Sequence, residues 1–157
     1  MTKELKQEFT LRVSQANATR MIVILYEILM EYINEARECL GSGNLEGFHD
    51  AVTHSICCLR ELSSSINFDN EMSGNLLSLY VFCTKELTKA NLHNSGEELY
   101  HVEIIIQKLH KTYLELAQRD TSSPVMKNTQ VVYAGLTYGK ESLIVNLSQD
   151  VNRGYSI

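Results

Sequence analysis

The sequence predicts an all-α protein, built as an antiparallel, up-down-up-down four-helix bundle. Over most of residues 15–120, apolar residues recur at spacings of three and four, as they do along one side of an amphipathic helix. Turn-forming residues break this pattern at 41–44, 67–70 and 91–96. Connections this short make successive helices antiparallel, which is the reason for predicting an up-down bundle.

The first predicted helix covers about residues 15–40. One side of it is apolar along its whole length: Ile22, Leu25, Leu29, Ile33, Ala36 and Leu40. Gly41 follows this stripe directly, and glycine readily adopts the left-handed conformation that commonly ends a helix. We therefore expect the first helix to stop at Gly41.

The other three predicted helices cover about residues 45–67, 71–91 and 96–119. Each has an apolar stripe with helical spacing. The stripes are Leu45, Phe48, Val52, Ile56, Leu59, Leu62 and Ile66, then Leu76, Leu79, Tyr80, Cys83, Leu87 and Ala90, then Leu99, Val102, Ile106, Leu109, Tyr113 and Leu116.

Polar residues suited to capping precede these three helices. Asn44 stands before the second helix, and Asp69 or Asn70 stands before the third. Ser95 and Glu98 have the spacing of a capping box, in which the serine closes the first turn and the glutamate reaches back. These residues predict where each helix begins.

The chain contains more apolar residues than the four stripes account for. They are Met21, Val23, Ile24, Ile28 and Met30 in the first helix, Leu77, Val81 and Phe82 in the third, and Ile104 and Ile105 in the fourth. Burying one such side chain contributes about 1.5–3 kcal/mol, so we expect something to cover this surface. The candidates are the N-terminal leader, the C-terminal tail, a second copy of the chain and a client peptide. Alternatively, the first helix is central and its neighbours wrap around it.

Charge and motifs exclude several classes of function. The 157 residues carry a net charge of −5 without a cluster of Lys and Arg, so nucleic acid is not an expected partner. The apolar run at 19–30 is too short to cross a bilayer and contains Glu27, so we expect no membrane insertion. No convincing signal peptide is present, and we expect a cytoplasmic protein with reduced cysteines. Phosphate-loop, nucleophile-elbow and zinc-protease motifs are missing, so we expect neither an enzyme nor a cofactor.

Two Glu-x-x-His pairs favour one alternative, a metal-binding bundle of the di-iron type. The pairs are Glu46 with His49 and Glu98 with His101, in the first turns of the second and fourth helices. These helices are parallel in an up-down bundle, so both pairs lie at the same end. Against a metal site, Glu46 and His101 fall outside the apolar stripes, and the helix dipole already explains acidic residues in a first turn. We therefore expect no bound metal.

Four segments of the chain, taken in order, match a known family pattern. QANATRMIVILYE at 15–27 is similar to T-A-x-P-x-x-L-x-x-M-L-Y-D/E, and LREL at 59–62 matches I-x-E-L. Residues 75–91 match N-L-x-x-L-Y followed by L-x-x-A-N. The fourth segment follows the pattern at Leu99, Val102, Leu109 and Tyr113. This order and spacing resemble the flagellar secretion chaperone FliS family over about residues 9–119.

The resemblance implies a chaperone that binds the C-terminal segment of flagellin, prevents premature polymerisation and delivers flagellin to the flagellar export gate. In this family the client's apolar residues lie in grooves between helices, and the chaperone's own leader can occupy one groove when no client is present. In this chain Leu5, Phe9, Leu11 and Val13 could do so. The expected client contacts are apolar positions: Val13, Met21, Ile24, Ile28, Leu77, Tyr80, Val81, Ile104 and Ile105.

The chain departs from the family pattern at several positions. Ala18 stands where the family usually has proline, Tyr113 where it has tryptophan, and Ile28 where it has a small residue. In the leader, Glu8 occupies the position of a family tyrosine. These departures affect the expected details of client docking more than the expected fold.

The sequence thus predicts three parts: a leader at 1–14, the bundle at 15–120 and a tail at 121–157. The tail lies outside the resemblance but contains many apolar residues, so we expect it to pack on the bundle and to cover part of its surface. A helical module that forms a homodimer through its first helix is the remaining alternative.

Overall fold

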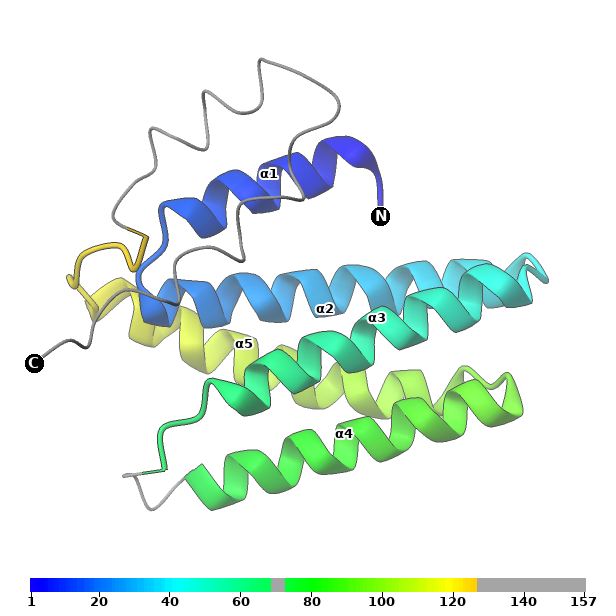
Figure 1. The fold of residues 1–157 in the computed structure, drawn as a ribbon. Coiled ribbons are helices and arrows are strands. Elements are labelled where there is room, and N and C mark those ends of the chain that lie inside the picture. Colours follow the sequence, from blue (N-terminus) through cyan, green and yellow to red (C-terminus); the bar gives the residue numbers. More distant parts are fainter. Residues whose placement is uncertain (69–72, 127–157) are drawn as a thin grey trace, which may run out of the picture. The chain divides into compact units, whose positions relative to one another are not determined.

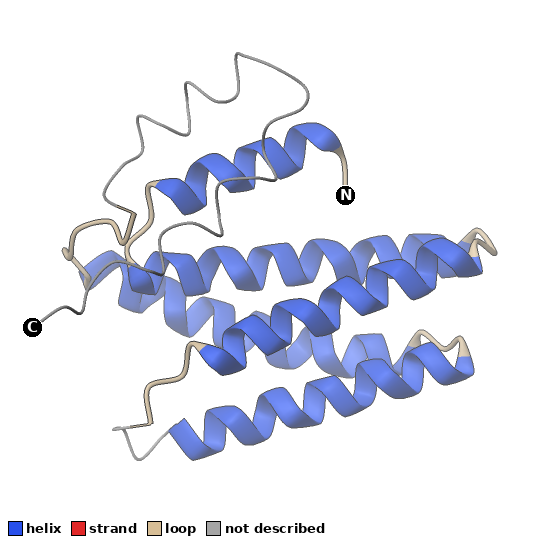
Figure 2. Ribbon diagram, viewed as in Figure 1, coloured by secondary structure: helices blue, strands red, loops and turns tan. Residues whose placement is uncertain are grey.

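The computed structural model describes residues 1–68 and 73–126, and these residues form five helices and no strand (Figures 1 and 2). The all-α prediction is therefore confirmed for this part of the chain. The helices are α1 (Lys3–Ser14), α2 (Ala18–Gly41), α3 (Leu45–Ser64), α4 (Ser73–His93) and α5 (Glu97–Arg119).

Residues Met1–Val125 form one compact unit. The predicted cap at Asp69 or Asn70 lies outside the described residues, and so does most of the predicted tail of 121–157, namely residues 127–157.

Helices α2 to α5 pack around one core. α2 lies against α3 and α5, and α4 also lies against α3 and α5, while α1 lies against α2 (Figure 1). The largest fully buried side chains come from all four of the longer helices: Tyr26, Tyr80, Phe48, Leu29, Ile33, Leu59, Leu62, Leu87, Leu99, Ile106, Val52 and Val102.

Most of the predicted stripe residues belong to this core, but some do not. Leu45 is 44% exposed, Leu79 38% and Leu116 48%. Conversely, Tyr26 is completely buried although its position is not on the predicted stripe of the first helix. Leu79 and Leu116 are exposed because they border a groove at one end of the helices, described below.

Asn17 fixes the start of α2 and also holds the segment that follows α5. Its Oδ1 accepts a hydrogen bond from the Arg20 backbone N–H at 2.9 Å, which caps the helix. Its Nδ2 donates to the carbonyl oxygens of Asp120 and Ser122, at 3.2 and 3.3 Å. The Val125 backbone N–H donates to the Ala16 carbonyl at 3.1 Å, so residues 120–125 lie against the junction of α1 and α2.

α2 ends at Gly41 as predicted, but Gly41 is not the left-handed residue. Gly41 is the last helical residue, and the left-handed residue is Gly43, with φ of 75°. The Asn44 N–H donates to the Cys39 carbonyl at 2.8 Å, and the Gly43 N–H donates to the Leu40 carbonyl at 3.1 Å. This pair of bonds is a Schellman motif with glycine at its left-handed position.

The starts of α3 and α5 differ in how well they were predicted. Asn44 caps α3 as expected, because its Oδ1 accepts a hydrogen bond from the Gly47 N–H at 3.0 Å. In α5 the helix begins at Glu97, and Gly96 is the cap residue without a side-chain bond. Ser95 Oγ accepts from the Glu97 N–H at 3.3 Å, and a hydrogen bond with Ser95 is the main cause of the lowered pKa of Glu98. The predicted capping box is therefore wrong in its cap residue: Ser95 precedes the Gly96 cap, although it still contacts the first turn at Glu97 and Glu98.

Candidate functional site

Helix α1 covers the second apolar face of α2. Phe9 of α1, Ala16 of the link between α1 and α2, and Ile24 of α2 form a small buried cluster, and Phe9 is 6% exposed. Partly buried residues surround this cluster: Met1, Leu5, Val13, Met21 and Ile28. Three of the surplus apolar residues of α2, Met21, Ile24 and Ile28, are thus covered by α1, whereas Met30 packs against the main core.

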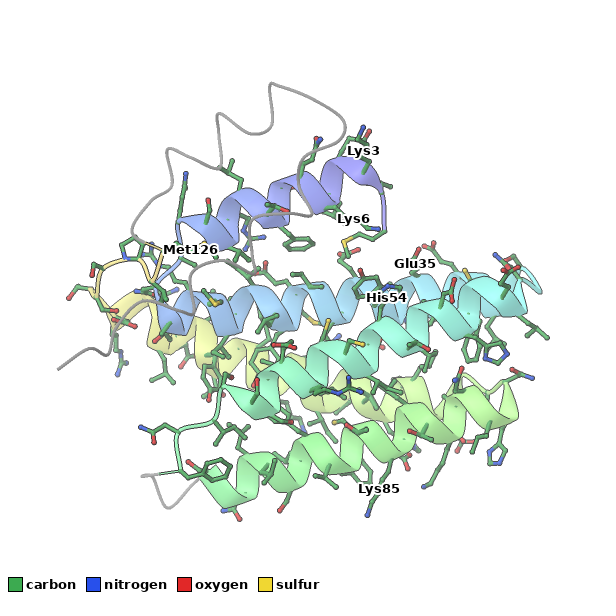
Figure 3. All side chains as sticks on the ribbon, viewed as in Figure 1. Lys3, Lys6, Glu35, His54, Lys85 and Met126 are labelled. Atoms are coloured by element: carbon green, nitrogen blue, oxygen red, sulfur yellow. The ribbon has the colours of Figure 1, made fainter. Side chains whose placement is uncertain are left out.

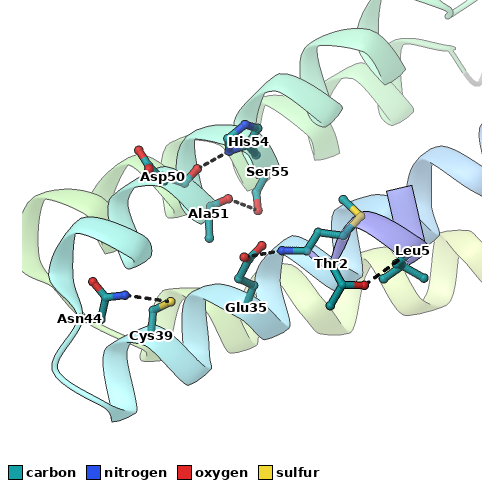
Figure 4. Close-up of polar contacts among 10 residues, drawn as sticks. Thr2, Leu5, Glu35, Cys39, Asn44, Asp50, Ala51, His54 and Ser55 are labelled. Carbon is teal, nitrogen blue, oxygen red and sulfur yellow. Dashed lines mark hydrogen bonds and ion pairs between the residues drawn. The ribbon is translucent and has the colours of Figure 1, made fainter. Parts of the chain in front are cut away.

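Ion pairs fix α1 near both of its ends. Arg12 pairs with Glu27 of α2, and the guanidinium of Arg12 also lies 5.5 Å from the centre of the Phe9 ring. The N-terminal amine pairs with Glu35 of α2, beside the Thr2 cap of α1 (Figure 4). Because these pairs are partly exposed, each contributes little to stability, about 0–1 kcal/mol. The main attachment of α1 is therefore its apolar contact with α2, in which Phe9 is the buried residue.

An apolar groove of about 570 Å³ lies where the start of α2, the end of α3, the start of α4 and the end of α5 meet. Most of its lining is apolar, and a few hydroxyl and amide groups stand among the apolar residues. The lining residues are Thr19, Ile22, Leu62, Ser65, Ile66, Asn67, Ser73, Asn75, Leu76, Leu79, Tyr80, Leu109, Thr112, Tyr113 and Leu116. Apolar walls with scattered polar groups are typical of sites that bind an amphipathic segment of another protein.

Three tyrosines lie at the groove and in the core beneath it. The hydroxyl groups of Tyr26 and Tyr80 are hydrogen-bonded to each other, and the Tyr113 ring centre is 5.6 Å from that of Tyr26. Burial raises the pKa of Tyr80 to about 12. Burial, followed by the hydrogen bond with Tyr80, raises the pKa of Tyr26 further. Both hydroxyls are therefore neutral at physiological pH, and the pair is a structural link between α2 and α4.

A second hollow, of about 340 Å³, lies between α1, α2 and α5. Its lining combines charged residues, Arg12, Arg20 and Glu27, with apolar residues of α2 and α5. His110 of α5 lies 3.4 Å from Glu27 Oε1, so Glu27 contacts α1 through Arg12 and α5 through His110. This hollow borders the α1 attachment, and movement of α1 would change its shape.

The structure divides the predicted client contacts by position. Four of them, Val13, Met21, Ile24 and Ile28, lie in or beside the cluster beneath α1. Leu77, Ile104 and Ile105 are half-buried on α4 and α5, and Val81 of α4 is 45% exposed. Tyr80 is 1% exposed and belongs to the core, so it offers a client no more than the floor of the groove.

The groove was not found from the sequence, although many of its residues were assigned to the stripes. Ile22, Ile66, Leu76, Leu79 and Leu116 have the same spacing as core residues, so periodicity alone cannot show that they border an opening. No local signal in the sequence distinguishes a stripe residue at an open end of the helices from one in the closed middle.

The Glu-x-x-His pairs do not form a common site. His49 Nδ1 lies 2.6 Å from Asn91 Oδ1, and His101 Nδ1 lies 3.0 Å from Glu86 Oε2. Hydrogen bonds from Lys89 and His101 lower the pKa of Glu86, which keeps this carboxylate ionised. Among the described residues no three His, Cys, Asp or Glu side chains are grouped so that they could hold a metal ion.

His54 of α3 makes contacts within α3 and with the neighbouring helix α2. Its Nδ1 lies 2.7 Å from the Asp50 carbonyl oxygen (Figure 4), and its ring stacks on Tyr32 of α2 at 4.8 Å. This contact joins α3 to α2 on the surface of the helices.

The fold and these surfaces define a class: a helical protein that keeps one apolar face covered by its own terminal helix and an apolar groove open. No described helix is long and apolar enough to span a membrane. The chain belongs to the FliS family, because the sequence pattern of the flagellar protein FliS matches residues 1–120. This is a family of flagellar export chaperones and not of enzymes, as the resemblance predicted. No curated protein matches the chain.

Proposed function

We propose that this protein is a cytoplasmic export chaperone that binds the C-terminal segment of flagellin, prevents its premature polymerisation and presents it to the flagellar export gate. Family membership supports this proposal. We further propose that α2 to α5 form the up-down-up-down bundle predicted from the sequence. The short connections and the contacts of α2 and α4 with both α3 and α5 support that topology.

The observation that carries the proposal is the position of α1 on α2. Among the apolar residues of α1 only Phe9 is buried, so the helix covers Ile24 and Ile28 with a small contact. An amphipathic client segment that buries more apolar surface on α2 would displace α1. Binding would then be a competition between two helices for one face.

The apolar groove offers the client a second place to bind. Its rim residues Leu79 and Leu116 are 38% and 48% exposed, and Thr19, Asn75 and Thr112 supply hydrogen-bonding groups beside them. A client segment that follows both surfaces would have its apolar residues covered in helix-in-groove fashion. Covered in this way, flagellin could not polymerise before export.

The test is binding of a peptide with the sequence of the flagellin C-terminal segment, measured by isothermal titration calorimetry. We expect a complex of one chaperone with one peptide, and light scattering to show the same stoichiometry. Leu116→Ser in the groove is expected to weaken binding about tenfold, since it removes an apolar contact worth about 1–2 kcal/mol.

The matched control is Leu45→Ser, which changes a leucine of similar exposure (44%) outside the groove. It should leave the affinity unchanged. Absence of binding to the wild-type chain would contradict the chaperone proposal. Equal losses in the two variants would contradict the groove, and a homodimer that the peptide does not alter would favour a dimerisation module instead.

A further inference from the structure

The side of α4 that faces away from the core carries exposed apolar residues. Val81 is 45% exposed, Phe82 44% and Leu92 74%. Tyr80 and Leu87, on the other side of the same helix, are buried in the core. Val81 and Leu92 are about 16 Å apart along the helix axis, given a rise of about 1.5 Å per residue. The exposed apolar positions thus extend over about three turns.

The exposed charges on α4 are basic. Its one acidic residue, Glu86, is 5% exposed and is engaged by Lys89 and by His101 of α5. Lys85 is exposed and points away from the neighbouring helices (Figure 3). Lys89 is also exposed over about half of its side chain. In a chain with a net charge of −5, this face is opposite in sign to the molecule as a whole.

We propose that the outer face of α4, formed by Val81, Phe82, Lys85 and Leu92, docks an acidic amphipathic helix of a partner protein. Its apolar side would cover Val81, Phe82 and Leu92, and its carboxylates would lie near Lys85 and Lys89. A helix of about three turns matches the length of the exposed face. Charge complementarity of this kind mainly determines which partner binds and how fast.

A second copy of the chain fits this face poorly. In a two-fold symmetric dimer the same patch lies on both sides of the interface, so the lysines of one copy would face those of the other. No exposed acidic residue of α4 could neutralise them. An anionic membrane is also disfavoured, because the net charge of −5 repels such a surface.

Val81 was also an expected client contact, but this docking face otherwise lies outside the groove and outside the face of α2 that α1 covers. α4 lies on the other side of α3 and α5 from α2, whose free face is covered by α1 (Figure 1). Neither Phe82 nor Lys85 lines the apolar groove. The chaperone could therefore hold flagellin and a second protein at the same time.

The experiment uses the full chain and a synthetic helical peptide of about 14 residues, with leucines on one face and glutamates beside them. Binding is followed by ¹⁵N-HSQC titration, which detects weak complexes and locates them. We expect shifts at residues 77–92 and a dissociation constant that rises about tenfold with Lys85→Glu and with Phe82→Ser. The control Arg60→Glu makes the same change of charge at an exposed position of α3, and should change the constant less than twofold.

Several outcomes would overturn the proposal. They are shifts confined to other helices, equal effects of Lys85→Glu and Arg60→Glu, and equally tight binding of a peptide with lysines in place of the glutamates. Binding of vesicles of phosphatidylglycerol and phosphatidylcholine that Phe82→Ser abolishes would assign the face to lipid. A dimer in light scattering that Phe82→Ser dissociates would assign it to a second copy. Phe82→Ser should leave flagellin-peptide binding intact, so failure of this proposal is distinguishable from failure of the chaperone function.

Discussion

Tyr26 and Tyr80 join α2 to α4 through a single hydrogen bond between two buried hydroxyl groups. Neither hydroxyl has another protein partner among the described contacts. Removing one of the two hydroxyls should lower the stability of the fold, because the remaining hydroxyl is left buried without a hydrogen-bond partner. Removing both hydroxyls leaves two rings of nearly the same shape and no unpaired group.

This asymmetry gives the first prediction. Tyr26→Phe and Tyr80→Phe should each lower the free energy of unfolding by about 1–3 kcal/mol, whereas the double variant should lose much less than the sum. Urea unfolding followed by circular dichroism measures all three values. The exposed Tyr100→Phe is the control and should change little. Additive losses would show that the two hydroxyls act independently.

Asp120 gives a prediction about pH. Hydrogen bonds from Thr19 and then from Ser122 lower the pKa of Asp120 to about 2, below the ordinary 3.8. Since the folded-state value is the lower one, the stabilising contribution is present above about pH 4 and disappears as the pH falls towards 2. Thr19→Val should raise the pKa of Asp120 towards 3.8 in a carboxyl ¹³C NMR titration. Thr88→Val, at an exposed position of α4, should not change it.

At the scale of the element, the end of α2 distinguishes two glycines that are two residues apart. Gly43 has φ of 75°, where a side chain is strained, so Gly43→Ala should destabilise the protein by about 1–2 kcal/mol. Gly41 is helical, and a Cβ there meets nothing within 4 Å. Gly41→Ala should therefore stabilise by up to about 1 kcal/mol. Thermal unfolding of the two variants checks the opposite signs; shifts in the same direction would contradict the assigned Schellman motif.

The four longer helices could be predicted from the sequence because each has an apolar stripe and turn residues at its ends. Exact ends could not, since whether Gly41 or Gly43 becomes left-handed depends on which carbonyls the following N–H groups reach. The helical state of residues 3–14 was not predicted either. Only Phe9 of α1 is both apolar and buried, and its partner Ile24 belongs to the next helix.

At the scale of the whole molecule, α1 has its own small cluster with α2, apart from the main core of α2 to α5. Phe9→Ala should therefore detach α1 without unfolding the other helices. In hydrogen exchange followed by mass spectrometry, residues 3–14 should lose protection while α3 to α5 keep theirs. The flagellin peptide should bind this variant several-fold more tightly, because the state in which α1 is detached and α2 is free to bind the peptide is more populated.

The control for this experiment lies in the same helix. Leu11 is 38% exposed, so Leu11→Ala should change neither exchange nor affinity. Loss of protection throughout the protein in the Phe9 variant would show that α1 is part of a single cooperative unit. Unchanged affinity for the flagellin peptide would show that α1 does not cover the surface to which the peptide binds.

The candidate site could be predicted only in part, for a reason that operates at this same scale. The excess of apolar residues in α2 was visible in the sequence, and it pointed to Met21, Ile24 and Ile28. The groove was not visible, because its walls come from four helices and become a surface only where those helices separate. Likewise, the hydroxyl contact of Tyr26 joins residues 54 positions apart, which no local pattern records.

Asn17 lies in the short link between α1 and α2. Its amide oxygen caps α2, and its amide nitrogen donates hydrogen bonds to the backbone after α5. The link about which α1 would move is therefore also hydrogen-bonded to the segment that follows α5. If a client displaced α1, the hydrogen bonds from Asn17 to Asp120 and Ser122 would be disturbed as well. The chaperone with a bound client would then differ from the free chaperone at residues 120–122, which the client does not contact.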